Sequence, residues 1–598
     1  MKIMKENWRL IRAFTRDARR YVRDVFLMHL LIAIVFIPAL MGFAKFLLNM
    51  GGINYMSYDN MGEIFLHHPF VATGLIATLL MLLLTVFFEF AFLLQSVYYV
   101  QMEQPASVRQ LIVGTLRSLK KIDKSSIFFF LFYFFLVIPL SGIKFNSELL
   151  GKFKIPVFIL DVVFAHRFII VSAVILVYIF LAYLSIRWVY VLPEMILNQR
   201  SVKEAVKYSM VETKRHFWKI FFKIIGVIGF FLLLTSFLYF ICFGAQALIE
   251  EVKPEIALPS AVIILTFLQL IWLFNGLFST IGLFYIIVDD MNQQGFLNDE
   301  FNHEIKPKKK GFIHFIKASI VLVGIVVVFV LTSMGNYVIL NDPFDDQVLS
   351  LSHRGVDNEN HVQNSLEALE MTNKDEKPDY VEMDVQETKD HDFVVYHDFN
   401  LRPLTGVNKK PYELNLDELT KLTVHENGME AKIVSFDAYL AKANELNQKL
   451  LIEIKTTKND SPEFMKRFTE RYRESILKNG HIIQSLTYDT VEELKQLEPK
   501  FYVGYILPFS FVGPPSGAMD FYALEYTTLG QGFVDSAHSI GKEVYAWTPN
   551  DETVMTRMMF NEVDGIITDQ MEVLNDVMES GKEMTYSDKL IFFMIGMG

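Results

Sequence analysis

The chain has 598 residues, of which 52% are hydrophobic and 21% are charged, and its mean hydropathy is +0.30. This composition is too apolar for a purely soluble protein and too charged for a purely membrane-embedded one, and it excludes disorder as the dominant state. Residues 1–340 carry 32 Lys and Arg against 21 Asp and Glu, whereas residues 341–598 carry 24 against 46. We therefore expect a basic membrane domain (1–340) followed by an acidic soluble domain (341–598).

The first domain contains apolar runs long enough to cross a bilayer, which takes about 20 residues per helix. Seven runs qualify, at 25–48, 71–100, 126–143, 168–191, 220–248, 261–288 and 315–338. The run at 157–165 is too short to span, and we interpret it as interfacial or re-entrant. The first run begins too late and is too long for a cleavable signal peptide.

Charge in the loops predicts the orientation of these helices. The segment before the first run contains eight Lys and Arg, whereas the next loop, 49–70, contains none. Cytoplasmic loops are enriched in Lys and Arg, so the N-terminus is expected in the cytoplasm. With seven spans, the protein would be a multi-pass protein of the cell membrane and 341–598 would be extracellular. One helix more or fewer would reverse the second conclusion.

Two further features of the membrane domain lead to predictions. A weak repeat at an offset of 94 relates Ser107-Val108-Arg109 to Ser201-Val202-Lys203, each before a span. We interpret both stretches as amphipathic helices that meet anionic lipid, with chance similarity as the alternative. Among the polar residues inside spans, Glu89 is a candidate functional group. Arg187 and Lys223 are expected to extend from helix ends toward the membrane surface.

The second domain shows alternating strand and helix patterns. Short β-rich runs occur at 348–353, 380–385, 449–454, 481–485, 502–507, 521–526, 543–547 and 565–568, with helical stretches such as 364–371, 461–477 and 490–497 between them. About 250 residues with this alternation suit a closed barrel of parallel strands. The predicted fold class is a multi-pass α-helical membrane domain followed by an α/β TIM-type (β/α)8 barrel.

Carboxylates follow the expected strands at the end where barrel enzymes place their functional groups. Glu382 and Asp384 are two residues apart in a strand and so point to the same side, and Glu453 ends a later strand. Three carboxylates that converge repel one another unless a cation lies among them. Oxygen ligands favour Ca²⁺ or Mg²⁺, so one divalent cation of this kind is the expected cofactor.

Histidines and cations complete the predicted site. His353-Arg354 ends the first strand, His397 follows a short apolar run, and Lys455 ends the strand of Glu453. A pair of histidines can exchange protons near neutral pH, and cations stabilise phosphoryl charge. The combination favours cleavage of a phosphate ester.

The order of these motifs resembles the glycerophosphodiester phosphodiesterase family, in the form fused to a membrane domain in some bacteria. The resemblance covers about 230 residues and rests on His353-Arg354-Gly355, Asn364-Ser365, Glu382-Met383-Asp384, His397-Asp398, Glu453-Ile454-Lys455, Trp547-Thr548 and Asp564-Gly565-Ile566-Ile567-Thr568-Asp569. It implies a TIM barrel that uses a divalent metal to hydrolyse glycerophosphodiesters to glycerol 3-phosphate and an alcohol.

The resemblance also implies roles for individual residues. Glu382, Asp384 and Glu453 would be the metal ligands, and His353 and His397 the acid and base. Arg354 and Lys455 would contact the phosphate and take part in catalysis, and Trp547 would pack on the glycerol moiety. One departure stands out: the family usually has Glu-Asn-Thr where this chain has Gln363-Asn364-Ser365.

Two other functions compete with this reading. One is a phosphoinositide-type phospholipase C, which shares the barrel and a histidine pair. The other is a transporter whose barrel serves as a sensor module. The expected partners are membrane lipid and a glycerophosphodiester, including lipid- or teichoic-acid-type glycerophosphates, and no nucleic acid is expected.

Overall fold

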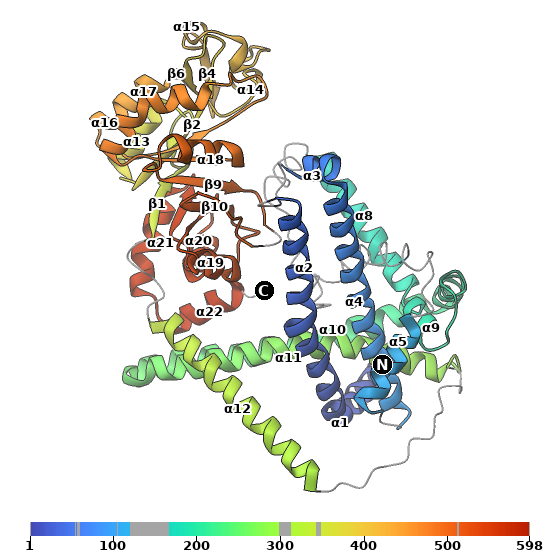
Figure 1. Cartoon of the computed structure of the whole chain (residues 1–598). Coiled ribbons are helices and arrows are strands. Elements are labelled where there is room, and N and C mark those ends of the chain that lie inside the picture. The colour runs from blue at the N-terminus through green and yellow to red at the C-terminus, as the bar shows by residue number, and fades with distance from the viewer. Residues whose placement is uncertain are drawn as a thin grey trace. The chain divides into compact units, whose positions relative to one another are not determined.

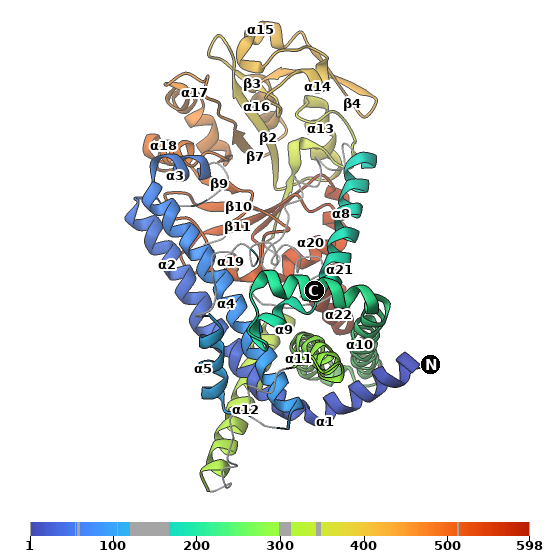
Figure 2. The same cartoon turned by 90° about the vertical axis from the view of Figure 1, so that its right-hand side faces the viewer.

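The computed structural model describes residues 2–53, 56, 60–103, 106–119, 129, 167–297, 312–341, 348–510 and 513–596. The chain divides into two compact units, which we describe separately: a helical unit within the first 337 residues and a unit built mainly from Val338–Gly598. Figures 1 and 2 show both units in two views.

Helices are the only regular secondary structure among the described residues of the first part of the chain. Its helices are α1 (Lys2–Leu31), α2 (Ile37–Met50), α3 (Met61–His67), α4 (Pro69–Gln101), α5 (Val108–Leu119), α8 (Arg167–Arg187), α9 (Val191–Ile196), α10 (Val202–Val252), α11 (Ala257–Gln293) and α12 (Phe312–Asn341), with a π-helical turn at Ile32–Phe36 and a 3₁₀ turn at Pro254–Ile256. Helix α10 continues through a non-helical residue at His216. The predicted surface helix and the following span therefore form one kinked element.

Five segments within the described ranges are long and apolar enough to cross a membrane: Arg23–Met50, Pro69–Gln101, Ile175–Ile196, Val202–Val252 and Pro254–Gln293. They coincide with the predicted spans at 25–48, 71–100, 168–191, 220–248 and 261–288. Apart from residue 129, the predicted span at 126–143 and the short run at 157–165 lie outside the described residues. The run at 315–338 falls within α12, and the part of this helix whose side chains are described, Val326–Asn341, is apolar. Seven spans, and with them an extracellular barrel, remain predictions.

The expectation for Arg187 and Lys223 was wrong, because both side chains are buried in the helical unit. The Nζ atom of Lys223 lies 2.7 Å from Oδ1 of Asp290 on α11, and the Tyr190 hydroxyl donates to the same carboxylate. The guanidinium of Arg187 donates to the carbonyl of Met210. Burial of a charge is tolerable where a partner charge and hydrogen bonds compensate it, as they do for Lys223.

The weak repeat has a structural counterpart at two helix starts. Ser107 accepts from the backbone of Gln110, whose side chain in turn accepts from the Ser107 backbone at 2.8 Å. Ser201 and Glu204 form the same reciprocal capping box at the start of α10. Such boxes satisfy backbone donors that a helix start leaves unpaired. The two stretches therefore share a local structure as well as a sequence pattern.

The second unit contains a closed barrel, which confirms the predicted fold class. Its eight parallel strands, within the described residues, are β1 (Leu349–Ser352), β2 (Tyr380–Glu387), β7 (Leu450–Ile454), β8 (Ile482–Ser485), β9 (Val503–Leu507), β10 (Phe521–Glu525), β11 (Glu543–Trp547) and β12 (Gly565–Thr568). Strand β1 pairs with both β12 and β2, which closes the sheet. All eight strands coincide with predicted runs.

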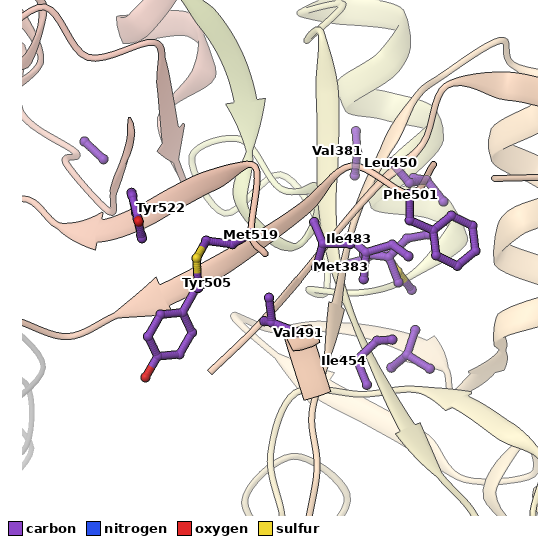
Figure 3. Packing of buried hydrophobic residues seen from close by; sticks show 14 of the residues in the cluster. Val381, Met383, Leu450, Ile454, Ile483, Val491, Phe501, Tyr505, Met519 and Tyr522 are labelled. Atoms are coloured by element: carbon purple, nitrogen blue, oxygen red, sulfur yellow. The ribbon is translucent and has the colours of Figure 1, made fainter. Parts of the chain in front are cut away.

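Helices cover the outside of the barrel, as the second unit in Figure 1 shows. They are α13 (Leu366–Asp375), α16 (Phe436–Glu445), α17 (Phe464–Asn479), α18 (Tyr488–Leu497), α19 (Gln531–His538), α20 (Glu552–Phe560), α21 (Met571–Glu583) and α22 (Tyr586–Gly596). The main core, part of which Figure 3 shows, includes Met383, Ile454 and Val491 from strands and helices. A second cluster on the alternate strand positions includes Leu451, Phe521 and Tyr545. A Cβ on Gly504 would lie 2.0 Å from the Phe521 ring, so glycine there makes room for that ring.

An insertion between β2 and α16 was not predicted beyond one apolar run. It comprises β3 (Phe393–Val395), α14 (Arg402–Thr405), a 3₁₀ turn at Pro411–Glu413, α15 (Leu416–Leu419), β4 (Thr423–Glu426), β5 (Met429–Lys432) and β6 (Val434–Ser435). Strand β3 is antiparallel to β2, and β6 is antiparallel to β3. Strands β4 and β5 form a separate hairpin. Both views show α14, α15 and β4 gathered at one end of the barrel unit (Figures 1 and 2).

Candidate active site

The three predicted carboxylates converge where β2 and β7 run side by side. Asp384 and Glu453 are register partners in this parallel pair, and Glu382 lies two residues before Asp384 on the same side. One oxygen from each of the three residues can be chosen so that all lie within 4.8 Å of one another. Glu382 and Asp384 are buried, and the Glu453 side chain is 12% exposed. The parallel pairing alone therefore assembles an acidic cluster.

The electrostatics of this cluster are set by burial and by close charges. Burial, followed by the charges of Asp384 and Glu453, raises the pKa of Glu382 well above its usual range. Burial also acts to raise the pKa of Asp384, but Lys455 and His397 outweigh it and hold that pKa below its usual value. Burial acts to lower the pKa of Lys455, while Glu453 and Asp384 keep it raised. The Lys455 amine thus stays charged beside Asp384.

The cluster fits a divalent cation. Within the described structure, Oε1 of Glu382 and Oδ1 of Asp384 are buried and have no hydrogen-bond partner. Leaving a buried carboxylate oxygen without a partner is costly, and a bound cation would remove that cost. The donors are all oxygen atoms, which suit Ca²⁺ or Mg²⁺ better than zinc.

Each predicted histidine has a carboxylate on its Nδ1 atom. In His353, which follows β1, Nδ1 lies 2.6 Å from Oδ1 of Asp569, which follows the neighbouring strand β12. In His397, Nδ1 lies 2.8 Å from Oδ1 of Asp398. The side chains of His353 and His397 are 21% and 29% exposed. A carboxylate acceptor favours the proton on Nδ1, so Nε2 is the atom that can exchange a proton with a substrate.

Asp569 is itself held in place. The side-chain amide of Asn550 donates to Oδ2 of Asp569 at 2.8 Å, and the backbone N–H of Asp569 donates to Oδ1 of Asn550 at 3.0 Å. Burial acts to raise the pKa of Asp569, but the His353 charge and these hydrogen bonds lower it to about 2. The carboxylate is therefore ionised at neutral pH and fixes the His353 ring.

The two predicted phosphate-binding cations border the acidic cluster. Arg354 has a left-handed backbone (φ 54°), and its N–H donates to Oε2 of Glu382 at 2.8 Å. Its Nε atom lies 3.9 Å from Oδ2 of Asp384. The Nζ atom of Lys455 lies 3.2 Å from Glu453 and 3.4 Å from Asp384. Both cations are thus close to the carboxylates that would hold the metal.

Trp547 lies at the end of β11, as predicted, and its side chain is neither fully buried nor fully exposed. Its indole N–H donates to the carbonyl of Ala523 on β10 at 3.0 Å. This hydrogen bond fixes one edge of the ring against the neighbouring strand. Packing of the ring on a glycerol moiety remains a prediction.

Three supporting residues were not assigned from the sequence. Asn364 donates to Oδ2 of Asp384 at 2.8 Å and accepts from its backbone N–H. Its place in the Asn-Ser motif was the available signal. Asp569 could have been found too, since closing the barrel sets β12 beside β1. Glu426 of the inserted hairpin, which contacts Gln363, gave no sequence signal.

Comparison with known proteins identifies two matching family models. The model described as the membrane domain of glycerophosphoryl diester phosphodiesterase matches residues 7–330. The model described as the glycerophosphoryl diester phosphodiesterase family matches residues 353–573.

Individual relatives match about two fifths of the chain. A glycerophosphodiester phosphodiesterase from Caldanaerobacter subterraneus subsp. tengcongensis is 26% identical over 243 residues, which are 39% of this chain and 99% of the relative. The crystal structure of a glycerophosphodiester phosphodiesterase from Parabacteroides distasonis is 26% identical, with a TM-score of 0.34, covering 40% of this chain and 99% of that one. An Oleispira antarctica phosphodiesterase in complex with sn-glycerol-3-phosphate is 18% identical, with a TM-score of 0.34, covering 40% and 99%.

Proposed function

The chain belongs to the glycerophosphoryl diester phosphodiesterase family, with the membrane domain before the catalytic domain, and from this premise we propose how its site works. The protein is a glycerophosphodiester phosphodiesterase. Our proposal is that Glu382, Asp384 and Glu453 hold one divalent cation, Ca²⁺ or Mg²⁺, and that hydrolysis to glycerol 3-phosphate and an alcohol takes place beside them. The observation that carries this proposal is a pair of buried carboxylate oxygens without a hydrogen bond in the described structure, Oε1 of Glu382 and Oδ1 of Asp384, the second of which lies 3.4 Å from Lys455.

The proposed chemistry divides between the two histidines. The cation, when bound, would stabilise the charge that builds up on the phosphoryl oxygens. One of His353 and His397 takes a proton at its Nε2 from the attacking water, whose oxygen bonds to phosphorus. The P–O bond to the alcohol breaks, and the other histidine gives a proton to the oxygen of the leaving alcohol. Asp569 and Asp398 keep the two rings oriented for these transfers. General acid–base groups of this kind typically contribute about 10²–10⁴-fold each.

Arg354 and Lys455 are proposed to bind the phosphate and stabilise its charge in the transition state. Both lie close to Asp384, so a phosphate bound at the cation would meet them without rearrangement of the barrel. Trp547 is proposed to pack on the glycerol moiety. A planar aromatic ring held at one edge offers a flat apolar surface for such a group.

We also propose that the substrate is bound to a membrane. Helix α12 ends at Asn341 and β1 begins at Leu349. Eight residue steps reach about 30 Å at most, so a membrane-spanning α12 would keep the barrel near the bilayer. A soluble substrate needs no such tether. Lipid- or teichoic-acid-type glycerophosphates on the outer face of the cell membrane are the proposed substrates.

The test is to incubate the full-length protein, purified in detergent, with glycerophosphocholine, glycerophosphoglycerol and intact anionic lipids. Each reaction is run with Ca²⁺, with Mg²⁺ and with a chelator. We expect the protein to release glycerol 3-phosphate from at least one substrate and to lose activity when the chelator is present. Release of a cyclic inositol phosphate would instead indicate a phospholipase C, and activity unchanged by a chelator would refute the metal site.

A further inference from the structure

A chain of hydrogen bonds links the predicted phosphate ligand Arg354 to the inserted β4–β5 hairpin. The Nη1 atom of Arg354 donates to Oε1 of Gln363 at 2.7 Å. The Nε2 atom of Gln363 then donates to Oε1 of Glu426, at the end of β4. The backbone N–H of Gln363 donates to Oε2 of the same carboxylate at 2.9 Å. Both carboxylate oxygens of Glu426 therefore accept hydrogen bonds from Gln363.

From this arrangement we infer that Glu426 is a positioning residue, which holds Arg354 toward the substrate phosphate by acting through Gln363. The inference rests on the proposed role of Arg354 in phosphate binding. Glu426 itself contacts Gln363, so its effect on the reaction passes through the Gln363 side chain.

The side chain of Gln363 has the right chemistry for this link. An amide presents an oxygen that accepts and a nitrogen that donates, whereas an ionised carboxylate only accepts. The Gln363 oxygen faces the guanidinium and its nitrogen faces Glu426, so both ends match. A glutamate at 363, with Glu426 unchanged, would set two acceptors of like charge against each other.

The hairpin holds Glu426 firmly. Asn427 and Gly428 connect β4 to β5, and both have positive φ, 51° and 80°. Positive φ at both central residues is typical of the tight turns that join two antiparallel strands. Val424, two residues before Glu426, is buried in the insertion's own core. Glu426 thus lies beside a fixed turn rather than on a loose loop.

The hairpin also adjoins the catalytic residues. One cavity is lined by Gln363, Asn364 and His397 together with Val424 and Lys432 of the hairpin. Within the described residues, the Nε atom of Arg354 is buried without a hydrogen-bond partner and lies 3.9 Å from Oδ2 of Asp384, so the bond from Nη1 to Gln363 adds a directional contact to that ion pair.

This arrangement explains the departure noted in the sequence. The family pattern has a glutamate where this chain has Gln363, so the carboxylate near Arg354 would be lost. In this chain the carboxylate is supplied by Glu426, which is 63 residues later in the sequence and contacts Gln363 instead of Arg354. The two positions should therefore exchange their side chains with function kept, because glutamate at 363 would accept from Arg354 and glutamine at 426 would donate to it.

The test compares Gln363→Glu, Glu426→Gln and the double variant with the full-length wild type. The readouts are kcat, KM for glycerophosphoglycerol, and the Kd of glycerol 3-phosphate with the chosen divalent cation present. We expect Gln363→Glu to raise KM and Kd about tenfold and Glu426→Gln about threefold, typical of coupling between residues in one network. The double variant should return both constants to within about threefold of wild type.

The matched control is Glu430→Gln, the same change on the partner strand of the same hairpin. Glu430 is exposed and lies 3.2 Å from His425, away from Gln363. It should leave KM and Kd unchanged. If Gln363→Glu does not fold, Glu426→Gln and the double variant still decide the question.

Two results would overturn the inference. In the first, the wild type is active but the double variant is as impaired as Gln363→Glu. In the second, Glu426→Gln and Glu430→Gln behave alike. A wild type without activity on any diester would refute the proposed function, and the inference with it.

Discussion

Replacing Asp569 by asparagine should slow turnover while substrate binding stays close to normal. The change removes the negative charge of the Asp569 side chain. Its Oδ1 lies 2.6 Å from Nδ1 of His353, and its Oδ2 accepts a hydrogen bond from Asn550. A hydrogen bond to a charged group contributes about 1.5–3 kcal/mol. If that energy acts in the transition state, kcat falls by about 10- to 150-fold, at 1.36 kcal/mol per tenfold. The Asp569 carboxylate makes its hydrogen bonds to His353 and Asn550, and it acts on the proposed phosphate ligand Arg354 through charge alone, so KM should change by less than about threefold.

The assay is steady-state kinetics on glycerophosphoglycerol with the divalent cation at saturation. Asp564→Asn is the matched control. Asp564 immediately precedes β12, whereas Asp569 follows it, and Oδ2 of Asp564 lies 2.8 Å from Nε2 of His538. This control can lower stability but should leave kcat within about twofold. An Asp569→Asn enzyme with wild-type kcat, or one that loses only affinity, would refute the reasoning.

The same substitution should alter how stability depends on pH. The pKa of Asp569 is about 2 in the folded chain, below the value of about 3.9 for an unfolded aspartate. A depressed pKa stabilises the fold above about pH 4, and that stability is lost as pH falls through about 2. Because the side chain is 33% exposed, solvent reduces the contribution to about 1 kcal/mol. The free energy of unfolding of Asp569→Asn should therefore not lose this contribution as the pH falls from about 4 to about 2.

Three other predictions concern the metal, the membrane and the buried ion pair. Asp384→Asn should weaken binding of the divalent cation by tenfold or more in a calorimetric titration, and unchanged affinity would exclude Asp384 as a ligand. Cysteines can be placed at Lys409 and at Lys309 in a Cys242→Ser background. On intact cells, an impermeant thiol reagent should label the cysteine at 409 and not the one at 309. Label at 309 alone would reverse the topology. Lys223→Ala should destabilise the helical unit in detergent by up to about 3–5 kcal/mol, because the buried Asp290 carboxylate loses the cation at 2.7 Å and keeps the more distant Lys219, at 3.7 Å. Asp290→Asn in the same chain should restore part of the loss, and a melting temperature equal to wild type would contradict the role of the Lys223–Asp290 pair.

The barrel could be predicted because its strands carry their own signal. Runs such as Gly565–Thr568 are short, apolar and separated by helical patterns, and parallel closure then brings their ends together. The carboxylates, histidines and Lys455 follow from that geometry. Strand period alone places Glu382 and Asp384 on one side, and pairing of β2 with β7 adds Glu453.

The rest depended on contacts between distant residues, which a single sequence does not show. The strands of the insertion have only two to four residues, and all but the apolar β3 mix polar with apolar side chains, so no period could be recognised in them. The burial of Lys223 depends on Asp290, 67 residues away. The link from Gln363 to Glu426 depends on a hairpin 63 residues away. In each case the partner, and not the local pattern, decides the structure.

His353 and His397, which follow strands β1 and β3, are proposed to carry the hydrolysis. The most direct measurement follows glycerol 3-phosphate formation by phosphorus NMR with wild-type protein, His353→Ala and His397→Ala, each checked for an unchanged melting temperature. Each substitution should lower the rate by about 10²–10⁴-fold, because each removes one general acid–base group. Retention of more than a tenth of the wild-type rate in both folded variants would contradict it.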